Sequence, residues 1–208
     1  MNIYELFYLN QAIDSKDIYN VPSFSELYFS ESIHQIVRES LYQTGYLDNA
    51  SNYTPKALDA INKIKQYKYA RKYIIINSTA FGINDENNLG VMLRQYEDDY
   101  SFYHLNMSNP DRQLLSAYRS FFNEQTMPVS KISGRFINLE SFERHFGLNS
   151  GEFLKIITIT RGPGKITSTN EIFFIMDNRL YYYDFNSQLL ITPDMVRVNA
   201  ILKARLSI

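Results

Sequence analysis

The chain contains no cysteine among its 208 residues, and it has only three histidines, His34, His104 and His145. The absence of cysteine excludes disulfide bonds, thiolate metal sites and a cysteine nucleophile. The three histidines lie too far apart in sequence to meet on one helix or strand, although histidine is the usual proton shuttle and a common metal ligand. We therefore expect no metal and no cofactor.

An excess of charge of one sign is also missing. The chain has 21 basic and 22 acidic residues, which gives a formal net charge of −1. Non-specific nucleic-acid binding depends on Lys and Arg that neutralise phosphates, so we expect no nucleic-acid partner.

Long apolar runs are missing as well. No uninterrupted stretch approaches the roughly 20 residues that span a bilayer, which predicts no direct membrane insertion. The first residues include an acidic Glu5 where a signal peptide would carry positive charge. We expect a cytoplasmic protein.

Three segments resemble catalytic or ion-binding motifs without matching them. Arg161–Lys165 lacks the glycine spacing of a phosphate-binding loop, and Ser150 is not central between Gly147 and Gly151 as a hydrolase elbow requires. The acidic cluster 97–99 lacks the alternating ligands of a calcium loop. We interpret the three segments as a connection, a turn and a hairpin tip, and expect no enzymatic activity.

Aromatic residues, by contrast, are abundant, with 17 Tyr and 14 Phe. Aromatic rings fill cores and also supply contact area at interfaces. We expect most of them in the core and in the sheet.

A weak internal repeat, at an offset of roughly 81 residues, organises the chain. Each half has an apolar strand, a hairpin and a helix start. The strands predicted in the first half are Tyr73–Ile76, Val91–Tyr96 and Tyr100–Leu105, and those in the second half are Phe153–Thr160, Glu171–Met176 and Leu180–Phe185.

The repeat predicts the fold class. We expect one α+β domain over residues 1–208, in which two antiparallel three-strand units are related by a pseudo-two-fold axis and flanked by helices. The two halves cover residues of about 54–122 and 138–206.

Helix signals surround these strands. Apolar spacing predicts a short helix at Ile3–Ile13 and a longer one from about Ile33, which ends at Gly45. A cap followed by proline, Thr54-Pro55, opens another helix. Helices also start at Asn109-Pro110, at Asn138 and at Thr192, and the last runs to about Leu206.

Two segments offer apolar side chains beyond what the core requires. The connection Ala80–Gly90 is long and polar, so its apolar residues are expected to be exposed anchors for a partner. The C-terminal helix is apolar on more than one face. The candidate partner-binding residues are Phe81, Ile83, Asn84, Asp85, Leu89, Met195, Val198 and Leu202.

The order of elements resembles a known family. The short N-terminal helix, the helix ending at Leu41–Leu47, the Thr54–Ile61 helix, the strand Tyr73–Ile76 and the duplicated hairpins resemble the EspG-type chaperones of type VII (ESX) secretion. The likeness is greatest to their Gram-positive EsaE-type relatives. The likeness lies in the pattern of elements and extends over nearly the whole chain.

The resemblance implies a non-catalytic cytosolic chaperone connected with virulence. Such a protein binds a secreted helical effector or toxin, keeps it soluble and directs it to the membrane secretion ATPase. It would be peripheral at the inner face of the membrane through that machinery. In the family, the loop after the first central strand and the C-terminal helical region touch the substrate.

Two other functions stay open at the level of sequence. An immunity protein that blocks a toxin would share the cytosolic location and the protein-binding surface. An enzyme with a site between the two halves would assemble its residues from distant parts of the chain.

Overall fold

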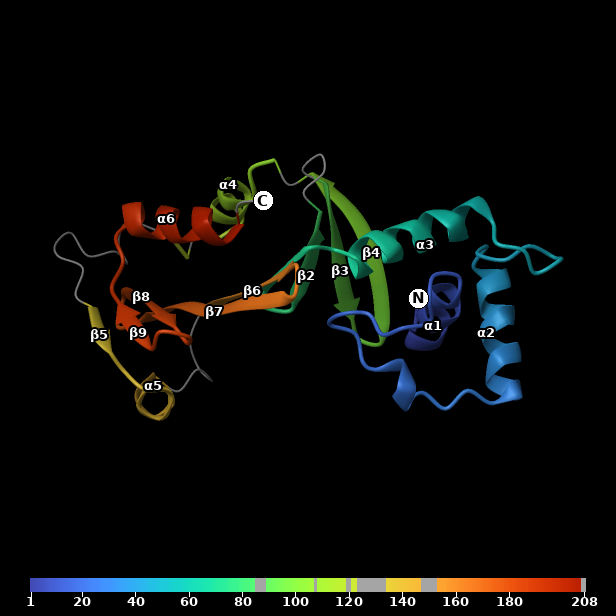
Figure 1. Ribbon diagram of the computed structural model, residues 1–208, viewed down its shortest axis with the longest axis horizontal. Coiled ribbons are helices and arrows are strands. Elements are labelled where there is room, and N and C mark those ends of the chain that lie inside the picture. The colour runs from blue at the N-terminus through green and yellow to red at the C-terminus, as the bar shows by residue number, and fades with distance from the viewer. Residues whose placement is uncertain (85–88, 107, 119–120, 123–133, 147–152, 207–208) are drawn as a thin grey trace. The chain divides into compact units, whose positions relative to one another are not determined.

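A computed structural model describes residues 1–84, 89–106, 108–118, 121–122, 134–146 and 153–206 (Figure 1). Its described part has an α+β fold with antiparallel strand pairing and flanking helices, as the sequence predicts. The chain divides into two compact units. Unit 1 comprises residues 1–71 and 78–106, and unit 2 comprises residues 72–77 and 107–208.

Three capped α-helices form much of unit 1: α1 (Ile3–Gln11), α2 (Glu31–Gln43) and α3 (Pro55–Lys68). Asn2 caps α1 in a capping box with Glu5, whose carboxylate also accepts a hydrogen bond of 2.5 Å from the Ser40 hydroxyl of α2. Thr54 caps α3, with Pro55 in its first turn as predicted. A short 3₁₀ turn, η1 (Phe24–Glu26), lies between α1 and α2.

The strands of unit 1 pack against α3. They are β2 (Thr79–Ile83), β3 (Leu89–Tyr96) and β4 (Asp99–Asn106), in the spatial order β4-β3-β2. A Cβ atom at Gly82 would lie 3.0 Å from side-chain atoms of Ala70 and Tyr67, so only glycine lets β2 approach α3 this closely. Tyr67 in turn meets Phe102 of β4 edge to face, at 5.6 Å between ring centroids.

A buried lysine joins the N-terminal segment to α3. The Lys68 ammonium donates to the side chains of Asn10, at 3.0 Å, and Asp14, and to the Lys16 carbonyl. The Tyr69 hydroxyl donates to the second oxygen of Asp14 at 2.6 Å. These bonds compensate the burial of the lysine charge, which would otherwise be costly.

Six of the described strands lie in unit 2. In spatial order they are β1 (Lys72–Ile76), β6 (Phe153–Gly162), β7 (Lys165–Met176), β8 (Arg179–Asp184), β9 (Leu189–Ile191) and β5 (Gly134–Phe136), and all pairings are antiparallel. Asp177 and Asn178, with φ angles of 50° and 59°, connect β7 to β8. The sequence predicts this tight turn from the same two residues.

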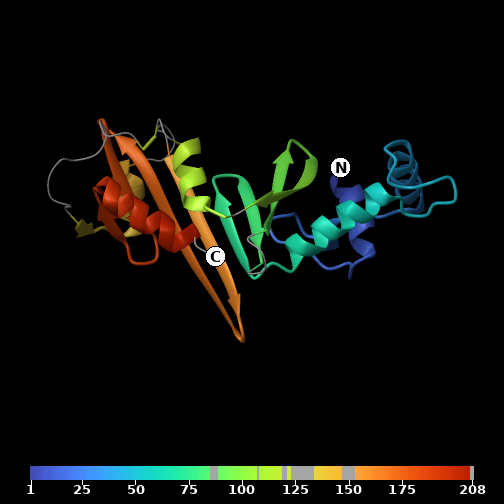
Figure 2. The ribbon, with the colours of Figure 1, turned by 90° about the horizontal axis from the view of Figure 1, so that it is seen from above.

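Helices cover both faces of this sheet (Figures 1 and 2). The helix α5 (Leu139–Phe146) packs on one face, and α4 (Pro110–Ala117) lies beside α6 (Met195–Leu206) on the other. Successive side chains of β7 point to opposite faces of the sheet and so contribute to the packing on both. Ile172 packs towards α5, whereas Glu171 bonds to Arg205 of α6.

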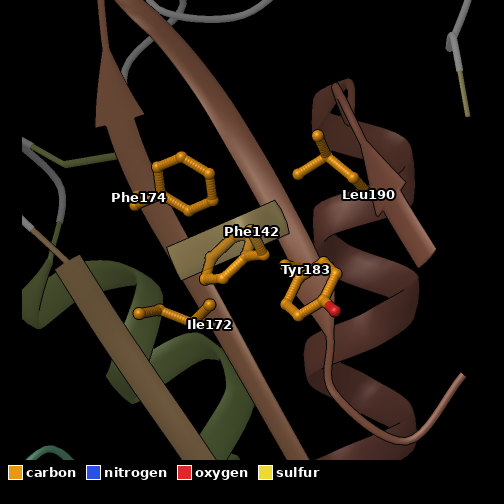
Figure 3. Packing of buried hydrophobic residues seen from close by; sticks show 5 residues of the cluster. All are labelled: Phe142, Ile172, Phe174, Tyr183 and Leu190. Carbon is orange, nitrogen blue, oxygen red and sulfur yellow. The ribbon is translucent and has the colours of Figure 1, made fainter. Parts of the chain in front are cut away.

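Stacked aromatic rings form the core under α5 (Figure 3). Phe142 lies parallel to Tyr183 of β8, at 4.0 Å between centroids and an interplanar angle of 7°. Phe174 meets Phe142 edge to face at 5.6 Å. The Tyr183 hydroxyl, the only polar group of this buried ring, donates to the Ile137 carbonyl at 2.8 Å.

The prediction that Ala80–Gly90 is a connecting loop is wrong. Residues 79–83 form β2, and β3 already begins at Leu89. The first half of the repeat therefore supplies four strands where the sequence predicted three. Superposition of the two halves by a pseudo-two-fold axis stays a prediction.

We expect Phe142→Ala to lower the free energy of unfolding by about 3 to 5 kcal/mol, because it removes a ring that contacts two buried rings. Urea unfolding followed by circular dichroism measures this change. Leu139→Ala, in the same helix but 43% exposed, is the control, and it should change stability by less than about 0.5 kcal/mol. Equal effects of the two variants would contradict the assigned core.

Bonds from Lys68 and Tyr69 lower the pKa of Asp14 from 3.8 to about 2. A carboxyl group whose pKa is lower in the folded state stabilises the fold above its unfolded pKa, and this contribution disappears as the pH falls towards 2. Asp14→Asn should therefore be less stable than the wild type at pH 6, with the difference shrinking between about pH 4 and pH 2. Urea unfolding across that range tests this.

The matched variant Tyr69→Phe removes one hydrogen bond to Asp14 and leaves the lysine contact. It should lower the free energy of unfolding at pH 6 less than Asp14→Asn does, because the bond from Lys68 to Asp14 remains. A difference between Asp14→Asn and the wild type that stays constant with pH would show that the carboxylate charge is unimportant.

Candidate functional site

The residues predicted to bind a partner near position 80 do not form an exposed loop. Ile83 is fully buried in unit 1, so its expected exposure is wrong. Phe81 is half-buried in β2, and the Asn84 amide donates to the Gln66 carbonyl at 3.3 Å. Leu89 is the first residue of β3, and Asp85 lies outside the described residues.

Two of the three candidates on the C-terminal helix belong to the core. Val198 and Leu202 are both fully buried, which contradicts their expected role in an exposed apolar face. Met195, at the start of α6, is 37% exposed. Helical spacing of three to four residues groups apolar side chains on one face, but it does not say whether a neighbour covers that face.

An ion pair fixes the last turn of α6 to the sheet. Arg205 Nε lies 2.5 Å from an oxygen of Glu171, a fully buried side chain of β7. Burial raises the pKa of Glu171, and the Arg205 guanidinium opposes this shift. Burial also raises the pKa of the neighbouring Tyr182 hydroxyl, which keeps it protonated. The helix is therefore held as a structural element of unit 2.

Unit 1 presents a different apolar feature, which we name the aromatic surface. It is built where α1, the first turn of α2, the segment before α2 and the turn before α3 come together. Its members are Tyr4, Phe7, Tyr8, Phe29, His34 and Tyr53.

The rings of the aromatic surface contact one another in a continuous chain. Phe29 lies 5.6 Å from Tyr4, 5.1 Å from Phe7 and 6.0 Å from His34, measured between ring centroids. Tyr8 extends the chain, at 5.5 Å from His34 and 6.5 Å from Tyr53. Edge-to-face and tilted contacts at these separations are favourable, so the rings hold one another in place.

All six rings keep part of their surface in water. Tyr53 is 37% exposed, and the other five members are half-buried. Phe7 also contacts the buried Phe24 ring, at 5.1 Å between centroids. Pre-positioned aromatic rings that are not yet fully covered can bury more apolar area when a partner binds, and such rings dominate the energetics of many interfaces.

Sequence analysis did not identify this surface, although α1 carried a signal for it. Leu6 and Leu9 define the buried face of α1, and both are fully buried. Tyr4, Phe7 and Tyr8 follow the same three-to-four spacing on another face of this helix. Phe29 and Tyr53 come from irregular segments, where no periodicity indicates which way a side chain points.

The histidines form no common site. His104 Nε2 lies 3.0 Å from the Gln66 side-chain oxygen, His145 Nδ1 lies 2.7 Å from the Ser141 carbonyl, and His34 belongs to the aromatic surface. Within the described residues, no three His, Asp or Glu side chains gather closely enough to hold a metal ion.

None of the helices in the described residues is long and apolar enough to span a bilayer.

The chain belongs to the family described as Domain of unknown function (DUF5081), whose model matches residues 1–145. The match covers all of unit 1, and thus the whole aromatic surface, together with β1, α4, β5 and most of α5. A search of curated proteins finds no match to this chain.

Because Ile83 is fully buried, its truncation should act on folding. We expect Ile83→Ala to reduce the free energy of unfolding by about 2 to 4 kcal/mol. Leu58→Ala on α3, where the side chain is 56% exposed, should be nearly neutral and serves as control. Thermal unfolding of both variants measures the effect. An unchanged melting temperature for Ile83→Ala would show that Ile83 does not contribute to folding, and Ile83 would again be a candidate for contact with a partner.

Proposed function

We propose that this chain is a non-catalytic adaptor that binds a helical protein through the aromatic surface. The observation that carries the proposal is the continuous chain of six partly exposed rings in unit 1. Isolated exposed apolar residues are ordinary on protein surfaces, but a contiguous group of them is typical of an interaction site.

The composition of this surface suits a helical partner. Its rings come from two helices, α1 and α2, and from the segments before α2 and α3, so several elements together present one aromatic face. An amphipathic helix recognises such a face through side chains spaced three to four residues apart. Tyr hydroxyls and His34 can in addition exchange hydrogen bonds with polar groups at the rim.

The resemblance to EspG-type and EsaE-type chaperones suggests which partner this is. On that basis the partner is a secreted helical effector or toxin of a type VII system, which the adaptor keeps soluble in the cytoplasm. The complex would then be delivered to the membrane secretion ATPase. This part of the proposal rests on the order of elements along the chain.

The apolar residues near position 80 and on α6 are less suited to the main contact. The side chains of Val198 and Leu202 are buried in the core of unit 2, and the side chain of Ile83 is buried in the core of unit 1. Phe81 and Met195 keep some exposure and stay candidates for secondary contacts. The aromatic surface offers more partly exposed apolar groups in one place than either of them.

The test uses co-purification with each helical protein encoded beside the gene. We expect the double variant Tyr8→Ala with Tyr53→Ala to lose about a hundredfold in affinity, since interface anchors of this type typically contribute 1 to 2 kcal/mol each. Isothermal titration calorimetry of the purified pair measures the loss. The melting temperature of the variant shows whether it is folded.

Tyr96→Ala is the matched control, because Tyr96 lies in β3 of the same unit and is 67% exposed outside the aromatic surface. Its affinity should equal that of the wild type. If the folded double variant binds normally, the aromatic surface is not the contact. If the captured partner is a toxin whose activity is abolished on binding, the chain acts as an immunity protein.

A further inference from the structure

A second, chemically different site lies at the β5 end of the strand order in unit 2. A pocket of about 240 Å³ is present there, lined by residues of β5, β8 and β9 and by the residue after β9. The lining residues are Gly134, Arg135, Arg179, Tyr181, Leu190, Ile191 and Thr192. Two guanidinium groups thus line one small pocket whose lining contains no acidic residue.

Strand register places both arginines on the same face of the sheet. Arg135 lies directly opposite Leu190, which packs in the core under α5. Arg179 and Tyr181 precede Tyr183 of that core by four and two residues along β8, so the period of two directs them to the same face. The described structure gives neither Arg135 nor Arg179 an acidic partner, and both side chains are exposed.

Within the described residues, the strand beside this pocket, β5, pairs on one side only. The Ile137 N–H donates to the Gln188 carbonyl, which shows that odd-numbered residues here point their backbone groups towards β9. By the alternation of an antiparallel ladder, the N–H and C=O of Gly134 and Phe136 point outwards. No strand of the described residues pairs with that side of β5.

The side chains of β5 are equally uncovered. All three residues of the strand are exposed, and the Phe136 ring is 81% exposed. An edge whose outward backbone groups and two guanidinium groups have no partner among the described residues, and which carries an exposed ring, presents three kinds of contact that one extended peptide can satisfy together.

We propose that β5 accepts an extended acidic segment of a partner protein as an additional strand. The partner's backbone pairs with Gly134 and Phe136. A Glu or Asp opposite Arg135 points to the same face of the sheet and places its carboxylate in the pocket between Arg135 and Arg179. Charge complementarity selects this occupant, since a guanidinium binds a carboxylate through paired, charge-assisted hydrogen bonds.

The proposal is independent of the aromatic surface, which lies in the other unit and is apolar. One partner could use both sites, or each site could bind a different protein. Variants at one site therefore leave the other intact, and failure of one proposal does not decide the other.

The experiment measures binding of a fluorescent ten-residue peptide with alternating Val and Glu by fluorescence anisotropy, using the full chain. We expect the Glu peptide to bind at least about tenfold more tightly than its Gln counterpart, and the advantage to fall as salt is raised. Arg135→Gln with Arg179→Gln should abolish the difference. Arg197→Gln, an exposed arginine of α6, is the control for loss of charge.

A second variant tests strand addition itself. Phe136→Pro removes an outward N–H and leaves the hydrogen bonds between β5 and β9 in place, so it should weaken binding of the Glu peptide about tenfold. Hydrogen exchange in β9 of this variant shows that the ladder persists. A peptide of equal charge with alternate prolines should not bind.

Three results would overturn the proposal. The first is equal binding of the Glu and Gln peptides to the wild type. The second is unchanged binding by the double arginine variant. The third is equal binding of the proline-containing peptide, which would reduce the interaction to attraction between charges.

Discussion

Burial of both faces of one sheet is the constraint on which unit 2 depends. Along β7, Ile172 and Phe174 enter the core under α5, while Glu171 and Phe173 face the opposite side. Neither face can be left uncovered without exposing large apolar side chains to water. The helices α5 and α6 are therefore needed for the same strand, and α6 contributes its apolar face to folding, which leaves little of it for a partner.

The buried carboxylate of β7 also depends on α6. Glu171 is fully buried, and its charge is tolerated because Arg205 approaches it from the end of α6. Removal of one member of such a pair usually costs more than the pair contributes, because the other charge is left buried. The ion pair thus specifies where the last turn of α6 lies.

Unit 1 depends on a different constraint. Much of its N-terminal segment is irregular, so side-chain contacts must hold it in place. Lys68 provides a charged anchor for the chain around Asp14, and the Phe24 ring provides an apolar one. With the chain held at these points, the rings of the aromatic surface are fixed without being covered. A binding surface can be rigid before its partner arrives, and rigidity of this kind reduces the entropy lost on binding.

The sequence by itself determined the local elements and the fold class. Capping at Thr54-Pro55, the apolar run Tyr73–Ile76 and the Asp177-Asn178 turn act through neighbours a few residues away, so all three could be predicted from the chain. Only the tertiary structure decided which apolar side chains are covered. Ile83 and Val198 are buried because distant segments pack on them, and Tyr8 meets Tyr53 only after folding brings them together, which no local periodicity encodes.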